Sequence, residues 1–527
     1  MGFRASRFRS LALAVLAVIS FSTLLGVTSA QAQWLKAESR NFIVYSDGNE
    51  RALREYVQDL ETFDWVLRVW TGRPVEEAAA RRLPIYLLSG RSDMRQVFPT
   101  ISDTVAGVYV PSTEDVFAVA LRGEEDDYVF HEYAHHFFLQ NFSGVTFPSW
   151  LSEGLAEYYM TVEIRPGSIQ LGSHNPWRAS SLFQGPWPPL EDLLSKRMGQ
   201  IRRADHQANY YSVAWLLTHW FLSDETRRPW LDVYLADVRS GGDPAEAMER
   251  ATGQNLNQLT QTLRTYARGG IRFSRIDNIA PQVEITVTRL PRSADDLLLL
   301  GQRIKIGVAE DQIDNTLAMV RRAAARHPGD PLALLVLGHA ELHMGDPVEG
   351  ERLLVQLLEI EPQNVEALQF MASARMMQAE ERPDDARVLL NQARGFLARA
   401  YAVDPDNYLT LYHNAKSREG AATYPNDNDL ETWIQAFTLA PQLPAVRLGF
   451  AAALIQADQR EAAIALLTPL ANAPHGGDAA DIALALIETA RSGGEAPPPE
   501  ALEAPVEPDM PPPGPSEEPA SPDTPTP

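Results

Sequence analysis

The 527-residue chain contains no cysteine. This absence excludes disulfide bonds, catalytic thiolates and thiolate metal ligands. It also excludes a lipid-modified cysteine next to a signal-peptide cleavage site. A metal site in this protein would therefore have to rely on histidine and carboxylate side chains.

The chain is short of positive charge, since its formal net charge is −23 and its pI is about 4.9. Such an acidic balance argues against nucleic acid as a partner. After residue 32 the sequence also lacks an apolar run long enough to cross a membrane. The length is typical of two to four domains.

Residues 1–32 have the pattern of a secretory signal peptide. Arg4, Arg7 and Arg9 precede a mostly apolar stretch, Leu11 to Val27, and Ala30-Gln31-Ala32 fits a cleavage site. The alternative is an uncleaved anchor helix. We expect an exported protein with no stable membrane span after cleavage, located in the periplasm if the source is a Gram-negative bacterium.

The region that follows alternates between strand and helix patterns. Apolar residues at helical spacing predict a helix over 52–70. Short β-prone runs bounded by turn residues predict strands over 41–45, 84–88, 107–110 and 116–121, the last two joined as a hairpin.

The second strand of this hairpin ends ten residues before His131. It could border an active-site cleft, and its free edge would then pair with an extended substrate backbone. The alternative is an ordinary covered strand. Both remain open from the sequence.

His131-Glu132-Tyr133-Ala134-His135 is an HExxH motif within an apolar stretch that predicts a helix over 128–142. Residues four apart lie on one face of a helix, so both imidazoles can reach one zinc ion. Glu132 lies beside them in the position of a general base.

A third ligand is needed, and HExxHxxGxxH is excluded because Phe138 and Asn141 occupy the last two motif positions. A second predicted helix, 149–160, supplies Glu153 as the candidate, which would leave the fourth position of the metal open. Glu157 follows on the same face and could accept a hydrogen bond from a ligand histidine. The exchanged roles, with Glu157 as the ligand, remain possible, as does a solvated Glu157.

His131 to Glu157, with the segment Trp150-Leu151-x-Glu153-Gly154-x-Ala156-Glu157, resembles the gluzincin superfamily of HExxH zinc metallopeptidases, and especially its peptidase-MA-like branch. The resemblance implies an α+β zincin, thermolysin-like catalytic domain over 33–275 with one zinc ion per chain. Seventeen residues separate His135 from Glu153, one fewer than is usual in the aminopeptidase-like group. No aminopeptidase-type glycine-rich motif lies near residues 100–125, so aminopeptidase specificity is not implied.

The chemistry expected of this site is peptide-bond hydrolysis by a zinc-activated water, with Glu132 as general base. By resemblance, Tyr211 is the candidate donor to the oxyanion, with Tyr210 as the fallback; the alternative is that both tyrosines only pack. His136 is expected to support the site or to pack. Three further histidines receive no role: His174, His206 and His219.

The remainder of the chain is divided by composition. Residues 161–200 look rich in loops, 210–222 and 230–268 look helical, and 276–292 look like a linker. Residues 293–490 look helical with internal periodicity. Residues 491–527, rich in Pro, Glu and Ala, are predicted to be disordered.

The periodic region resembles degenerate tetratricopeptide repeats. Pro328 and Pro362 lie 34 residues apart, each followed by a polar pair, and Leu337-Gly338 and Gly350 fall at small-residue positions. We expect four to five repeats, with an insertion near 380–391. Glu341 departs from the pattern, because the family usually has an aromatic residue there. The alternative is a plain helical domain; a repeat array would offer a concave face to a protein partner.

Three functions are compatible with these features. The first is an exported zinc metallopeptidase that acts on a peptide or protein substrate and recruits it, or a partner, through the repeats. The second is a catalytically silent interaction scaffold. The third is a zinc hydrolase of a non-peptide amide.

Overall fold

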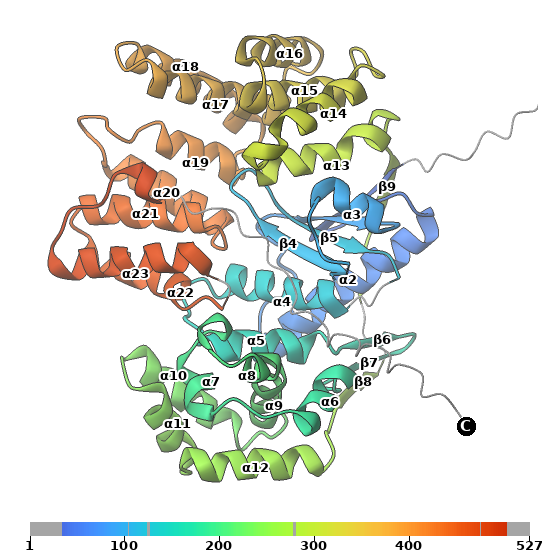
Figure 1. The fold of residues 1–527 in the computed structure, drawn as a ribbon, viewed down its shortest axis with the longest axis vertical. Coiled ribbons are helices and arrows are strands. Elements are labelled where there is room, and N and C mark those ends of the chain that lie inside the picture. Colours follow the sequence, from blue (N-terminus) through green and yellow to red (C-terminus); the bar gives the residue numbers. More distant parts are fainter. Residues whose placement is uncertain (1–33, 104, 124–126, 278–280, 475, 503–527) are drawn as a thin grey trace, which may run out of the picture.

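The computed structural model describes residues 34–103, 105–123, 127–277, 281–474 and 476–502. The predicted signal peptide and residues 503–527 lie outside this range. A mixed β-sheet with its helices occupies the middle of the molecule, a layer of helices lies below it, and a helical array curves over the top and one side (Figure 1). No described helix combines the length and apolar character needed to span a bilayer.

The main sheet has the strand order β4-β5-β3-β2-β1-β9. β2 pairs with β3, and β3 pairs with β5, both in parallel orientation. β4 runs antiparallel to β5 and forms the edge of the sheet. The strands are β1 Leu35–Glu38, β2 Phe42–Ser46, β3 Leu83–Leu88, β4 Gly107–Pro111, β5 Val116–Leu121 and β9 Thr286–Arg289. Of the two possibilities left open for β5, the structure shows the covered strand, because β5 pairs with β3 on one side and with β4 on the other, and the edge belongs to β4.

The segment 276–292, predicted as a linker, contains a strand of the main sheet. β9 pairs with β1 in antiparallel register, and β8, Ser274–Asp277, pairs with β7, Ser168–Leu171, in a small second sheet completed by β6, Glu163–Arg165. The prediction failed here because a four-residue edge strand forms only through pairing with a distant strand. The polypeptide thus returns to the sheet before it enters the helical array.

Helices α4, Asp127–Asn141, and α5, Ser149–Tyr159, lie where the sequence predicts them. α2, Glu50–Thr71, packs on the sheet, and α3 is Arg91–Val97. The region 161–200, expected as loop, contains β6, β7, α6 and α7. The lower layer comprises α6 Pro176–Gln184, α7 Leu190–Ser195, η1 Met198–Gln200, α8 Ala204–Ala208, α9 Tyr210–Leu222, α10 Arg228–Arg239, α11 Pro244–Thr252 and α12 Leu256–Arg268.

The helical array runs from α13 to α23 in antiparallel pairs (Figure 1). The polar pairs noted in the sequence cap its helices, since Asp330 and Asn364 accept hydrogen bonds from the first backbone N–H groups of α15 and α17. The helices are α13 Ser293–Ile306, α14 Ile313–Ala324, α15 Pro331–Met344, α16 Pro347–Ile360, α17 Val365–Glu381, α18 Ala386–Val403, α19 Tyr408–Lys416, α20 Asp427–Leu439, α21 Pro444–Gln456, α22 Arg460–Ala471 and α23 Gly477–Ser492, with η2 Glu310–Gln312 between α13 and α14.

Glycine allows the helices α15 and α16 to pack closely. A Cβ atom on Gly350 would lie 2.8 Å from the backbone nitrogen of Leu342, so glycine permits the close approach of α15 and α16. The predicted insertion near 380–391 does not form a separate loop. Instead α17 and α18 are lengthened to 17 and 18 residues and meet at a short turn.

The inner face of the array is occupied by the β4–β5 turn, residues 112–115. The Ser112 hydroxyl donates to the Lys305 carbonyl oxygen of α13 at 2.9 Å, and the Tyr408 hydroxyl of α19 donates to the Thr113 carbonyl oxygen at 3.0 Å. The Lys305 ammonium also lies 3.4 Å from Asp115. The face expected to be open to a partner therefore carries a segment of the same chain.

Part of the predicted disordered tail is folded. A 3₁₀ turn, η3, spans Pro499–Leu502, and Leu502 is buried against α21. Arg460 also donates to the Gly494 carbonyl oxygen at 2.7 Å. Composition alone does not reveal this contact. Leu502 packs on α21, which is distant in the sequence, so no local pattern indicates it.

Candidate metal centre

The structure brings the three predicted ligands together. Nε2 of His131 lies 3.2 Å from Nε2 of His135, and these atoms lie 3.4 and 3.5 Å from Oε2 of Glu153. Zinc bonds of about 2.0–2.1 Å at tetrahedral angles place ligand atoms about 3.3 Å apart. The triangle formed by the three side chains therefore has the dimensions of a zinc site.

Burial of the cluster supports the same interpretation. His131 is 3% exposed and Glu153 is completely buried. A buried carboxylate is costly unless a cation or hydrogen bonds compensate for its lost hydration. Two imidazoles and one carboxylate form a donor set suited to zinc, with a fourth position for water or substrate. Glu132 is buried on α4 directly after His131, and its role as the base stays a prediction.

Glu157 approaches the opposite side of His131. Its Oε1 atom lies 3.7 Å from Nδ1 of His131, and Arg178 of α6 donates to both carboxylate oxygens at 2.9 and 2.7 Å. Burial opposes the charge of Arg178, but the Glu157 carboxylate raises the pKa of the guanidinium above its ordinary value. This arrangement favours Glu153 over Glu157 as the ligand, since Glu157 is paired with Arg178 and lies beside the other nitrogen of the His131 ring.

Two contributors to the site were missed in the sequence. Arg178 lies in the region interpreted as loop; Asn175-Pro176 is a helix-start signal, but nothing local indicates that the helix aims an arginine at Glu157. The Ser152 hydroxyl lies 3.3 Å from Nδ1 of His135. Its position before Glu153 was the available signal, because it places the hydroxyl on the ligand-bearing helix.

Glycine is required where α5 meets α9. A Cβ atom on Gly154 would lie 2.0 Å from the Thr218 hydroxyl and 2.6 Å from the Ala214 carbonyl oxygen. The helix that carries Glu153 therefore lies directly on α9. This contact explains the glycine that follows the ligand in the motif.

The two candidate tyrosines occupy different environments. The Tyr210 hydroxyl donates to the Lys196 carbonyl oxygen at 3.1 Å and is hydrogen-bonded to the Ser149 hydroxyl at 3.2 Å, so it joins α9 to α5 and to the end of α7. Tyr211 is buried, and the Arg178 guanidinium lies 5.0 Å from its ring centroid. Tyr211 is thus beside the Glu157–Arg178 pair, and its oxyanion role remains a prediction.

The other histidines differ in their contacts. Nδ1 of His136 lies 2.9 Å from the Tyr109 hydroxyl of β4, and burial, with the charge of Arg81, lowers the pKa of His136 to about 3. His136 therefore joins α4 to the edge strand β4. His219 bonds to Tyr266 and two backbone carbonyl oxygens, whereas His174 is exposed and His206 is half-buried.

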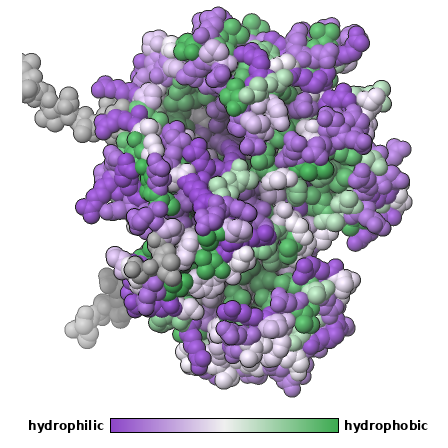
Figure 2. Space-filling model, turned by 180° about the vertical axis from the view of Figure 1, so that it is seen from behind, coloured by the Kyte–Doolittle hydropathy of each residue, from purple (hydrophilic) through white to green (hydrophobic). Residues whose placement is uncertain are grey.

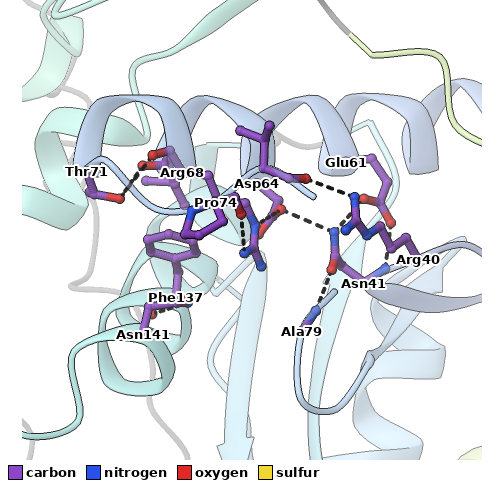
Figure 3. A network of polar contacts seen from close by, with 12 residues as sticks. Arg40, Asn41, Glu61, Asp64, Arg68, Thr71, Pro74, Ala79, Phe137 and Asn141 are labelled. Carbon is purple, nitrogen blue, oxygen red and sulfur yellow. Dashed lines mark hydrogen bonds and ion pairs between the residues drawn. The ribbon is translucent and has the colours of Figure 1, made fainter. Parts of the chain in front are cut away.

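A buried polar network supports α4 from the side of α2. The Tyr133 hydroxyl, within the HExxH motif, donates to Asp64 at 2.7 Å. Figure 3 shows Asp64 and Glu61 pointing from α2 toward Asn41, which donates to them at 3.2 and 2.7 Å, while Arg68 donates to Asp64 at 2.6 Å. The Tyr133–Asp64 bond thus connects α4, between its two motif histidines, to this network.

A cavity of about 480 Å³ lies beside the cluster. Its lining includes His135 and Ser152, and also His413 of α19, Gln442 between α20 and α21, and Leu502 of η3. Seen from behind, apolar side chains gather in the recess between the lower helices and the rest of the molecule (Figure 2). The array therefore forms part of the space in front of the cluster.

Comparison with known proteins identifies the helical array. Residues 308–374 match the family model of the tetratricopeptide repeat, whereas no curated protein matches the chain. A thermophilic TPR protein of Thermus thermophilus is 22% identical, with a TM-score of 0.32 over 37% of this chain and 99% of that chain. Two structures of MamA are 16% and 15% identical, with TM-scores of 0.24 and 0.23 over 37% of this chain and 93% and 98% of theirs.

The family match and the paired helices together show a tetratricopeptide-like solenoid in the C-terminal half. Such repeats generally mediate contacts between proteins. The residues of the candidate metal centre lie outside the matched segment, so their chemistry rests on their own geometry.

Proposed function

We propose that this protein is an exported zinc-dependent peptidase whose repeats help to hold its substrate or a partner protein. The observation that carries the proposal is the triangle of His131, His135 and Glu153, with edges of 3.2–3.5 Å. The distances were not implied by the motif alone, because Glu153 comes from a separate helix.

Zinc, when bound, would lower the pKa of a water molecule to about 7 and polarise the substrate carbonyl. Glu132 takes the proton from this water and delivers it to the leaving amine. Glu157 and Arg178 keep the His131 ring in place, and Ser152 does the same for His135. Tyr211 is proposed to donate to the oxyanion; the two hydrogen bonds of Tyr210 make it the weaker candidate.

The surroundings favour an extended peptide as the substrate. β4 is the edge strand, and its Tyr109 contacts the metal helix through His136. An extended backbone could add to this edge by strand pairing. The cavity between α4 and the array, about 480 Å³, would then receive substrate side chains.

The test uses the mature protein, a mixed peptide library and mass spectrometry of the products. Wild type should cleave, a chelator should abolish cleavage and added zinc should restore it. Glu132→Gln should reduce kcat by at least about a hundredfold while retaining zinc, because it removes a proton acceptor but no ligand. Equal cleavage by wild type and Glu132→Gln would contradict the mechanism.

The repeats support a second candidate function, an interaction scaffold in which catalysis plays no part. The family match at residues 308–374 favours it. Full partner binding by a wild type that contains no zinc would establish it. A zinc-containing protein that cleaves no peptide but hydrolyses cell-wall amide cross-links would support the third possibility, a hydrolase of non-peptide amides.

Export rests on the pattern of residues 1–32. The mature chain should begin near Gln33, and N-terminal sequencing of the protein recovered from the cell exterior or periplasm checks this. Recovery with an intact N-terminus in the membrane fraction would favour the anchor instead.

A further inference from the structure

A second histidine pair lies on α15, one helical turn apart. The ring centroids of His339 and His343 are 4.9 Å apart and their planes are inclined by 89°. The corresponding values for His131 and His135 are 4.9 Å and 75°. The helical spacing thus gives the repeat array the same two-imidazole arrangement as the candidate catalytic helix.

The third member of this cluster comes from the β4–β5 turn. Oε2 of Glu114 lies 3.0 Å from Nε2 of His339, and the potential ligand atoms of Glu114, His339 and His343 lie within 4.8 Å of one another. The two facing atoms are buried, and neither makes a hydrogen bond of regular geometry within the described residues. Among those residues, the other cluster of this kind is the one formed by His131, His135 and Glu153.

The cluster combines a fixed imidazole with an accessible one. The His339 ring stacks on Phe370 of α17, with 4.0 Å between centroids and 13° between planes. His343 is exposed, so an ion can enter from its side. Glu114 faces the fixed ring from the β4–β5 turn, and its carboxylate supplies the oxygen ligand of the cluster.

We propose that Glu114, His339 and His343 form a second divalent metal site, which takes zinc and fastens the β4–β5 turn to the repeat array. Two imidazoles and a carboxylate match the ligand preference of zinc, with water completing the tetrahedron. Its ligands come from two distant segments of the chain, residues 114 and 339–343, so a bound ion would cross-link them.

The fastened turn connects the array to the edge strand. β4 ends at Pro111, just before the turn, and its Tyr109 contacts His136 on the metal helix. An ion bound at Glu114 would restrict the motion of β4. The second site thus links the repeats to the strand that borders the candidate peptidase site.

The experiment is a zinc count by elemental analysis on the full-length mature protein, after saturation with zinc chloride and dialysis. We compare wild type with His343→Ala, His135→Ala and the double variant. His343 is chosen because its exposed side chain can be truncated without opening the core; Glu114→Gln is the second variant. His174→Ala, an exposed histidine outside both clusters, is the control.

The proposal predicts about two zinc ions per chain in wild type and His174→Ala, about one in each single variant and none in the double variant. One ion in wild type that is lost in His135→Ala and retained in His343→Ala would overturn this proposal and leave the peptidase proposal standing. One ion lost only in His343→Ala would support the second site and count against the first. No zinc in wild type would overturn both.

Hydrogen exchange supplies a readout that a passive ion pair would not produce. In His135→Ala, where the first site is disabled, zinc should slow amide exchange in residues 107–121 and 331–344 by tenfold or more. The double variant should show no such effect. Zinc retention without slower exchange in either segment would overturn the fastening role.

Discussion

Arg178 shows how a residue without its own motif can determine the geometry of the candidate metal centre. Its guanidinium holds both oxygens of Glu157, which in turn faces Nδ1 of His131. Orienting contacts of this type change metal affinity by about 10–100-fold when they are removed. The candidate metal centre therefore depends on more side chains than His131, Glu132, His135 and Glu153.

Arg178→Ala should weaken zinc binding at the first site by about 10–100-fold, because Glu157 loses its anchor and leaves the His131 ring less restrained. The measurement is competition with a chromophoric chelator in a His343→Ala background, which isolates the first site. Arg202→Ala, an exposed arginine, is the matched control. Unchanged affinity in Arg178→Ala would show that Glu157 orients nothing.

His219 is fully buried and bonded on both ring nitrogens, to the Tyr266 hydroxyl and to two carbonyl oxygens. Burial lowers its pKa below the ordinary value of 6.5, partly offset by the carbonyl contacts. Just below pH 6.5 the unfolded chain therefore binds more protons here than the folded chain does. The free energy of unfolding contributed by His219 is complete above pH 6.5 and falls as the pH drops toward the folded pKa.

His219→Gln should flatten this dependence. Urea midpoints measured between pH 7.5 and 5 should fall less steeply for the variant than for wild type, even though the variant is less stable at pH 7.5. Parallel curves for the two proteins would mean that another group controls the acid limb.

At the scale of elements, the sequence located those helices whose patterns lie within short segments of the chain. α4 and α5 were located because apolar periodicity, the HExxH spacing and Glu153 lie within short windows. The N-cap pairs of the repeats, such as Gly329-Asp330, were equally local. Glu153 was expected as the ligand because a second predicted helix with carboxylates follows the motif at a fitting distance.

The missed elements depend on contacts between distant residues. β9 is a strand only because β1 lies beside it, and β5 has no free edge because β3 pairs with the side opposite β4. Leu502 and the β4–β5 turn are held by helices far away in the sequence. His339 and His343 were visible as a pair at helical spacing, but their significance depends on Glu114, which is more than 200 residues away.

The α5–α9 contact yields a prediction at this scale. Gly154→Ala places a methyl group against Thr218 and the Ala214 carbonyl oxygen, so α5 must shift. Overpacking of this kind costs about 1–3 kcal/mol of stability, and the shift should also displace Glu153 and weaken zinc binding. Urea unfolding and chelator competition measure the two effects.

Gly144→Ala is the matched control, since a Cβ atom there meets nothing within 4 Å. Loss of stability in Gly154→Ala with wild-type zinc affinity would show that Glu153 does not depend on the position of α5. Wild-type stability of Gly154→Ala would show that α9 can move aside without lowering the free energy of unfolding.

At the scale of the whole molecule, the repeats and the metal-bearing region are not separate bodies. One continuous hydrophobic core contains Phe137 and Trp150 together with Tyr408 and Trp433 of the array. The inner face of the array holds the β4–β5 turn, so a partner of the repeats would have to use the outer face, the exposed rim or the cavity next to His135. A partner bound in that cavity would occupy the space next to His135.

Tyr408 tests this coupling. Its ring packs under the Arg81 guanidinium at 4.7 Å, its hydroxyl donates to Thr113, and it is 1% exposed. Tyr408→Ala should cost about 3–5 kcal/mol, and since 1.4 kcal/mol is a factor of ten, amide exchange should accelerate by 100-fold or more. If the molecule opens as one unit, the acceleration will appear both in residues 107–121 of the sheet and in residues 331–344 of α15.

Tyr401→Ala, at a 45%-exposed position on α18, should leave both segments unchanged. Acceleration confined to α19 would instead mean that the array opens independently and that its inner face can release the turn to admit a partner.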